Sequence, residues 1–296
     1  MTLRSTALLG LPAPAKLNLF LHVVGRRPDG KHLLESVFVF IDRSDTVDLE
    51  LIDSDEIIRT GDVVGEVEGD LCVRAARLLK EKFGIKRGVK IGLRKTIPSG
   101  AGMGGGSSDA ATTLIGLNRL FDLQLSRQEL IDLGVTLGAD VPFFLYGRNA
   151  FVEGIGEFFK PVEIPPSKIA VIWPGKSVST AKIFSDSALT RDTESSKIQD
   201  FQDSAKHLWP KLFGHNDLQP VAVSQENSIA QALTWLAPYC EPRMTGSGSA
   251  VFGILPPSER SVSNMLFKGM PAEWIGFITE SLPGHPLARW LDDKTG

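Results

Sequence analysis

The feature that most constrains the fold is a glycine-rich loop of eleven residues, Pro98 to Ser108, which contains five glycines. Glycine has no Cβ, so such a loop can turn through positive φ and bring its backbone close to a ligand. The apolar patterns on either side predict a strand over residues 89–93 and a helix that begins near Ser107. A helix N-terminus offers free N–H groups and the positive end of a dipole, so this strand–loop–helix unit suits a polyphosphate.

A flexible surface loop and two better-known phosphate loops are the alternatives, and the strand–loop–helix context argues against the first. A Walker A loop needs Gly-Lys-Ser/Thr, whereas Gly106 is followed by Ser107. The G-x-G-x-x-G spacing of a dinucleotide-binding loop is present within residues 100–105, but another helix follows instead of a strand that ends in an acid. We therefore expect a phosphate loop of another kind, in which Ser107 and Ser108 add hydroxyls for phosphate or for phosphate-bound Mg²⁺.

The composition indicates a globular protein of two ordinary domains, with 296 residues, 42% apolar and 23% charged. A net charge of −3 argues against a nucleic-acid partner, and no apolar run is long enough to cross a membrane. The stretch Ala7 to Leu11 only faintly imitates a secretory leader, because it is short and Pro12 breaks it. Cys72 and Cys240 are too far apart in sequence to form a metal or redox motif, and we expect both to be buried thiols in the cytoplasm.

Alternating residues predict a first strand over residues 16–24, with its aliphatic side toward the core. Lys16 and Asn18 are two positions apart, so a strand projects them from the same face. A Pro-Asp-Gly turn then predicts an antiparallel hairpin with a second strand over 33–41, and a third strand over 46–52.

Capping residues mark two helices, one over 70–83 with Asp70 at its N-cap and one over 127–137 that starts with the capping box Ser126 and Glu129.

The second half contains a predicted strand over 168–173, a helix over 229–236 and a second glycine–serine loop, 245–249. Proline and glycine cluster near residue 160, which suggests domains of residues 1–160 and 161–296.

Two residues could carry phosphoryl transfer, which needs positive charge over the transferred group and a base for the acceptor hydroxyl. Lys16 is the candidate for the charge, and Asp140, between a helix end and an apolar run, is the candidate for the base. Taken alone, each has a simpler interpretation. Lys16 can be a solvated lysine at the start of a strand, and Asp140 can be a helix or turn cap.

Three stretches together resemble the GHMP small-molecule kinases, namely residues 14–19, 98–111 and 245–252. Their order matches that superfamily, whose central loop approximates P-x-x-x-G-L-x-S-S-x-A. Residues 25–32 and 137–142 add a similarity to the members that act on a cytidine-diphosphate-linked polyol, 4-diphosphocytidyl-methylerythritol. The similarity runs through most of the chain.

The resemblance implies an α/β (α+β) two-domain architecture with the active site in the cleft between an N-terminal ATP-binding domain and a C-terminal substrate-binding domain. ATP, with Mg²⁺, would phosphorylate the 2-hydroxyl of that polyol in the non-mevalonate route to isoprenoids. Asp140 would be the catalytic aspartate and Lys16 the active-site lysine. The residues that would bind ATP are Pro98, Ser99, Gly100, Ala101, Gly102, Met103, Gly104, Gly105, Gly106, Ser107 and Ser108.

On the substrate side, the resemblance implies that Asn18 lies close to the acceptor, that His32 contacts the cytosine and that Phe184 stacks on it. The chain departs from the family at Lys31, where a tyrosine often stacks on the base. Lysine has no ring to stack, although its stem can cover one face. The alternatives are a kinase of another alcohol (a sugar, homoserine or a mevalonate-like compound) and a non-catalytic nucleotide-binding protein. The expected partners are small molecules, and the pattern indicates no oligomeric state.

Overall fold

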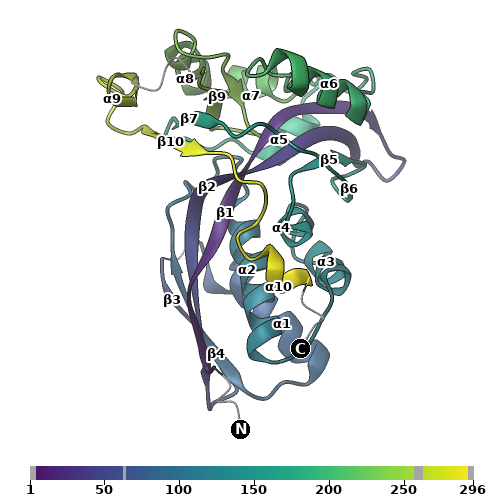
Figure 1. Ribbon diagram of the computed structural model, residues 1–296, viewed down its shortest axis with the longest axis vertical. Helices are drawn as coiled ribbons and strands as arrows, with labels where there is room; N and C mark the ends of the chain where they lie inside the picture. The colour runs from purple at the N-terminus through teal and green to yellow at the C-terminus, as the bar shows by residue number, and fades with distance from the viewer. Residues whose placement is uncertain (1–4, 63–64, 257–262, 293–296) are drawn as a thin grey trace.

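The molecule consists of two helix-covered sheets (Figure 1). Two long strands of the first sheet, β1 (Ala7–Arg26) and β2 (His32–Ile52), extend as far as the second sheet. The computed structural model describes residues 5–62, 65–256 and 263–292. Among these residues, no helix is both long enough and apolar enough to cross a bilayer.

The first sheet has the strand order β3-β4-β2-β5-β6, with β1 paired to β2. Its pairs are antiparallel except for β3 with β4, which is parallel. The other strands of this sheet are β3 (Ile57–Gly61), β4 (Gly88–Arg94), β5 (Ala150–Glu153) and β6 (Phe158–Pro161).

The hairpin of β1 and β2 differs from the prediction in two ways. The strands predicted over 33–41 and 46–52 are one strand, because the pairing with β1 continues between them. A register shift between Pro14 and Ala15 of β1 accommodates the additional residues of β2 at this point. The face that carries Lys16 and Asn18 is as buried as the aliphatic face, because this part of β1 is covered on both sides. β1 also starts earlier than predicted.

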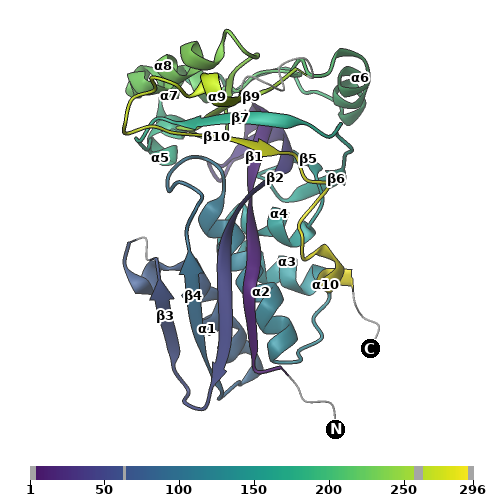
Figure 2. The same cartoon turned by 60° about the vertical axis from the view of Figure 1, so that its left-hand side comes forward.

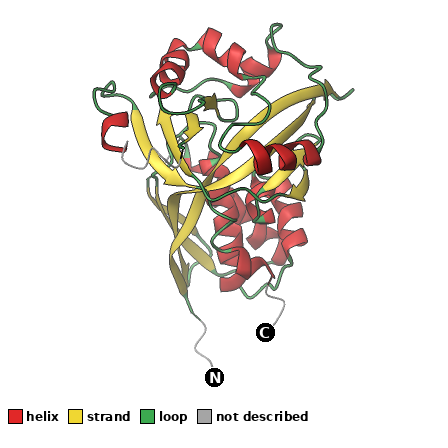
Figure 3. Ribbon diagram, turned by 45° about the horizontal axis from the view of Figure 1, so that its top comes forward, coloured by secondary structure: helices red, strands yellow, loops and turns green. Residues whose placement is uncertain are grey.

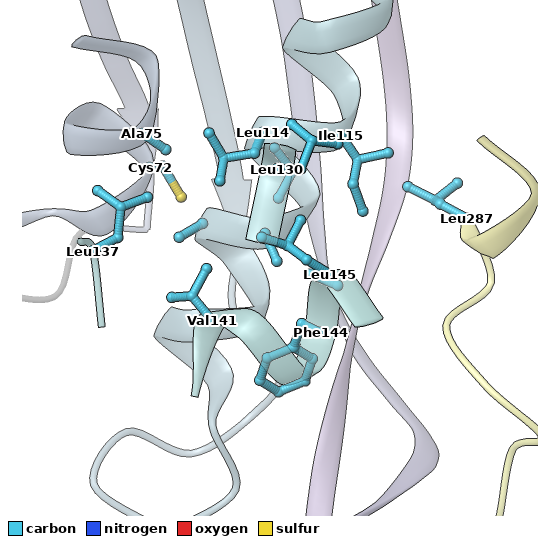
Figure 4. Packing of buried hydrophobic residues seen from close by; sticks show 14 of the residues in the cluster. Cys72, Ala75, Leu114, Ile115, Leu130, Leu137, Val141, Phe144, Leu145 and Leu287 are labelled. Atoms are coloured by element: carbon cyan, nitrogen blue, oxygen red, sulfur yellow. The ribbon is translucent and has the colours of Figure 1, made fainter. Parts of the chain in front are cut away.

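Helices cover one face of the first sheet: α1 (Leu71–Phe83), α2 (Gly105–Leu120), α3 (Arg127–Val135) and α4 (Val141–Tyr146), preceded by the short 3-10 turn η1 (Val67–Gly69). The predicted caps are confirmed, since the Asp70 carboxylate accepts a hydrogen bond from the Cys72 N–H and the capping box of Ser126 and Glu129 is formed. Apolar side chains from these helices interlock in the first hydrophobic core (Figure 4).

The second sheet has the order β10-β7-β9-β8 and lies across the upper ends of β1 and β2 (Figure 2). Its strands are β7 (Lys168–Trp173), β8 (Arg243–Met244), β9 (Val251–Ile254) and β10 (Ile275–Glu280). The helices around it, labelled in Figure 1, are α5 (Thr180–Ser185), α6 (Ile198–Leu208), α7 (Gln219–Gln225), α8 (Asn227–Leu236) and α9 (Ser263–Leu266). Figure 3 shows the molecule with this end turned toward the viewer, helices in red and strands in yellow.

The C-terminal segment leaves the second sheet and returns to the first core. After β10 the chain descends to α10 (Ala288–Asp292), which lies beside the helices of the first sheet (Figure 1). Leu287 and Leu291 are buried in that first core. The last part of the chain therefore belongs, by its packing, with the first sheet.

Candidate active site

The first strand, the glycine-rich loop and the second glycine–serine loop meet at one place, between the two sheets. The backbone N–H of Lys16 donates to the Met103 carbonyl at 3.0 Å. The backbone N–H of Ala250 donates to the Ala101 carbonyl at 3.1 Å. The glycine-rich loop is therefore attached by its main chain both to β1 and to the loop of the second sheet.

A pocket of about 600 Å³ opens at this junction, a size that suits a small-molecule ligand. Most of the predicted site residues line it: Lys16, Asn18, Asp140, Phe184 and the ten loop residues from Pro98 to Ser107. The other two predicted site residues, Ser108 and His32, lie outside its lining. Ser108 is fully buried, and its hydroxyl donates to the Pro14 carbonyl at 2.7 Å, so it fastens α2 to β1.

The loop needs glycine at the positions where it turns and touches other parts of the molecule. Gly102 has φ +75°, and a Cβ there would lie 2.4 Å from the Thr245 carbonyl oxygen. Gly104 has φ +71°, stands at the N-cap of α2, and leaves 2.9 Å between such a Cβ and the ring of Phe144. The first N–H groups of α2 have no helical carbonyl partner and point out of the N-terminal end of the helix, where an anion is favoured.

Lys16 brings a buried cation to the pocket. Its Nζ lies 2.6 Å from the Asn18 Oδ1, 3.7 Å from the Asp140 Oδ2 and 4.6 Å from the ring centre of Phe38. The Asn18 amide donates in turn to the Ser36 hydroxyl at 3.0 Å, which orients its oxygen toward the ammonium. Burial lowers the pKa of Lys16, and the nearby Asp140 carboxylate partly offsets that effect.

Neither simpler interpretation of the two candidates describes their side chains. The side chain of Lys16 is only 4% exposed, so it is not a solvated lysine. Asp140 occupies the N-cap position of α4, but its carboxylate makes no capping hydrogen bond with the described residues and is 35% exposed at the pocket. The carboxylate is therefore free to meet a ligand.

A buried ion-pair cluster beneath the loop was not foreseen. The Lys95 ammonium contacts the carboxylates of Asp45 and Asp109, and Asp45 also accepts hydrogen bonds from the N–H groups of Thr96 (2.5 Å) and Ile97 (2.8 Å). Burial tends to lower the pKa of Lys95, but the two carboxylates outweigh it and raise that pKa. Lys95 and Asp109 both line the pocket. Lys95 comes just before the loop, yet no local pattern links it to Asp45.

The two residues expected to recognise the base lie together, with Phe184 in the lining of the pocket and His32 next to it. The rings of His32 and Phe184 are stacked, with centroids 4.9 Å apart. Lys31, at the position where the family often has tyrosine, is exposed and lies outside the lining among the described residues. Arg191, which was also not foreseen, donates a hydrogen bond to the His32 ring at 3.2 Å.

The fold and this site define a small-molecule phosphotransferase of the GHMP kind. The model of the GHMP kinases N terminal domain matches residues 70–148, which include the glycine-rich loop and Asp140.

Similarity over nearly the whole chain gives the family. The chain is 50% identical over 281 residues to a 4-diphosphocytidyl-2-C-methyl-D-erythritol kinase of Ralstonia pickettii, covering 94% of this chain and 96% of that protein. It is 49% identical over 290 residues to the kinase of the same name from Burkholderia multivorans, covering 97% of this chain and 98% of that protein. A crystal structure of 4-(cytidine 5'-diphospho)-2C-methyl-D-erythritol kinase superposes with a TM-score of 0.78 at 32% identity, covering 93% of this chain and 98% of that one. The chain belongs to the 4-diphosphocytidyl-2-C-methyl-D-erythritol kinase family.

Proposed function

We propose that this chain transfers the γ-phosphoryl group of ATP to the 2-hydroxyl of 4-diphosphocytidyl-2-C-methyl-D-erythritol, in the non-mevalonate route to isoprenoids. The observation that carries the proposal is the pair Lys16 and Asp140, 3.7 Å apart in the pocket that the glycine-rich loop lines. Family membership supports the choice of acceptor.

Each part of the site has a separate task in the proposed reaction. The acceptor hydroxyl gives its proton to the Asp140 carboxylate as its oxygen attacks the γ-phosphorus, and the bond between that phosphorus and the β,γ-bridging oxygen breaks. The buried Lys16 ammonium stabilises the negative charge on the transferred group, because a fixed cation acts strongly where water is excluded. Asn18 positions that ammonium. The backbone of residues 98–107 and the N-terminus of α2 hold the phosphates.

Mg²⁺ is expected to enter with ATP, since it binds mainly through phosphate and water oxygens with one or two carboxylates. The oxygens that line the pocket fit this, because Ser107 presents a hydroxyl there and Asp109 a carboxylate. The described residues contain no group of three ligating side chains that would hold a metal by themselves. A cytoplasmic location is part of the proposal, and the free Cys72 and Cys240 support it, since unpaired thiols are usual in reducing compartments.

The test is an ATP-consumption assay of the purified chain with the diphosphocytidyl substrate against a panel of other alcohols, namely galactose, homoserine and mevalonate. We expect turnover with the cytidine-linked polyol only, and a phosphorylated product that mass spectrometry and ³¹P NMR locate at the 2-hydroxyl. Turnover with a panel alcohol alone would assign the chain to another GHMP activity. ATP binding without transfer to any acceptor would make it a nucleotide-binding protein.

A further inference from the structure

Arg191 joins the two residues at the base-binding side of the pocket. Its guanidinium donates to the backbone carbonyls of Phe184 (3.1 Å), Asp186 (2.6 Å) and Leu189 (2.9 Å). Its remaining contact is the hydrogen bond from its Nε to the Nε2 of His32, at 3.2 Å. Within the described part of the chain it forms no ion pair with a carboxylate. The guanidinium is therefore held in place by the main chain and aimed at one imidazole nitrogen.

This contact determines which nitrogen of His32 carries the proton. Arginine keeps its protons at any physiological pH and can only donate hydrogen bonds. The Nε2 of His32 must then be the acceptor, so the neutral ring carries its proton on Nδ1. Burial and the positive charges of Arg191 and Arg26 lower the pKa of His32, which also favours the neutral ring. His32 thus presents an N–H donor at Nδ1.

We propose that Arg191 is a positioning residue for base recognition, which acts by holding His32 in the Nδ1–H form that donates to an acceptor on the base. This inference rests on the proposed function and deepens it. Cytosine presents an acceptor at ring nitrogen N3, where uracil presents an N–H donor, so an Nδ1–H donor opposite N3 selects cytosine. Lys31 is exposed, whereas the half-buried ring of His32 stacks on Phe184, which lines the pocket. The stacked pair His32 and Phe184, with Arg191 behind it, therefore takes the larger part in recognising the base.

The tautomer can be measured in the free wild-type protein. Protonated and unprotonated imidazole nitrogens have distinct ¹⁵N chemical shifts, so a long-range ¹H–¹⁵N correlation spectrum of histidine-labelled protein identifies the form. The His32 signal is assigned by comparison with His32→Ala. We expect the proton on Nδ1 in the wild type and a mixture with the Nε2–H form in Arg191→Met. A wild-type ring protonated on Nε2 would overturn the inference, whether or not the chain has the proposed activity.

The effect on specificity is measured as the ratio of kcat/KM for the cytidine-linked polyol to that for its uridine-linked analogue. Arg191→Met is expected to lower this ratio about tenfold, the scale of one well-placed hydrogen bond, and to leave the KM for ATP unchanged. Arg26→Met is the matched control, because it removes a positive charge near His32 but its guanidinium donates to the Gly30 carbonyl instead of the imidazole. That variant is expected to keep the wild-type ratio.

A double substitution separates positioning through His32 from a purely structural role. In a His32→Ala background, Arg191→Met is expected to cause no further change in the base ratio, because the imidazole through which it acts is gone. An equal loss in both backgrounds would show that Arg191 affects the base by another route and would contradict the inference. Absence of turnover with both pyrimidine substrates would instead contradict the proposed function, and the tautomer measurement would still stand as the test of Arg191.

Discussion

Lys16 shows at the residue scale how much a side chain depends on its surroundings. Its position at the start of a predicted strand is typical of a solvated lysine. In the fold, however, its side chain is buried against Asn18 and the ring of Phe38. Removing an ammonium from water is expensive unless it is paired and hydrogen-bonded. The contacts with Asn18 and Asp140 supply that compensation, and the result is a fixed positive charge at the pocket.

The first prediction concerns Asp140. Asp140→Asn is expected to lower kcat by roughly 100-fold or more, because the amide cannot accept the proton of the acceptor hydroxyl. ATP binding is expected to stay near normal, since the glycine-rich loop is unchanged. Steady-state kinetics and ATP titration measure the two effects. Asp132→Asn, at an exposed position on α3, is the control and should keep wild-type turnover. Wild-type turnover in the Asp140 variant itself would remove the residue from its role.

At the scale of elements, the glycine-rich loop depends on what it packs against. Its main chain is bonded to β1 at Lys16 and to the loop before β9 at Ala250. Gly102 lies between these attachments, with the Thr245 carbonyl close to its Cα. The position of the phosphate loop is thus set jointly by both sheets, and a side chain at residue 102 would push them apart.

Gly102→Ala tests this dependence, with Gly10→Ala as the matched control. Both glycines have φ near +70° to +75°, so alanine is strained at either position by about 1–2 kcal/mol. Around Gly10 no described atom lies within 4 Å of an added Cβ, whereas at Gly102 the Thr245 oxygen is 2.4 Å away. We expect Gly102→Ala alone to lower kcat/KM for ATP by roughly tenfold or more, because the loop must shift. Equal ATP kinetics in the two variants would contradict this account.

At the scale of the whole molecule, the C-terminal segment connects the second sheet to the core of the first. It crosses from β10 back to the first core, where His285 is buried and its Nδ1 accepts a hydrogen bond from the Leu287 N–H at 3.0 Å. Burial lowers the pKa of His285 to about 3. The neutral imidazole is therefore part of the folded structure.

Acid should weaken this attachment. The ordinary pKa of histidine is 6.5, so between pH 6.5 and about 3 the unfolded chain binds a proton that the folded chain does not. Stability from this residue is thus present above pH 6.5 and is lost as the pH falls, by about 2 kcal/mol between pH 7 and pH 5. Urea unfolding at the two pH values measures the loss.

A non-titrating variant isolates the contribution of His285. His285→Asn keeps an oxygen that can accept the Leu287 N–H, and it is expected to reduce the difference in unfolding free energy between pH 7 and pH 5 by about 2 kcal/mol. His207→Asn is the control, because His207 is exposed on α6 and its ring stays in water in both states. An unchanged pH difference in the His285 variant would show that the buried imidazole is not the group responsible.

The sequence by itself determined the features that near neighbours encode. Strand β7 has the predicted bounds, the Asp70 cap and the Ser126 capping box are formed, and the strand–loop–helix unit around Gly104 is present. Periodicity, capping residues and glycine act over a few positions, so a local pattern is enough to predict them. The chemistry of Lys16 and Asp140 stays a prediction for the experiments above, and the division near residue 160 stays a prediction as well.

Only the tertiary structure decided which distant residues meet. Arg191 reaches a ring 159 positions earlier in the chain, and Lys95 pairs with a carboxylate 50 positions away. The two predicted strands form the single strand β2 because they pair with β1 along one continuous ladder. The C-terminal segment starts from the second sheet and packs in the core of the first, so its position requires both sheets to be in place. The physical reason is that burial and long-range contacts arise only when the elements have packed, so no window of sequence contains them.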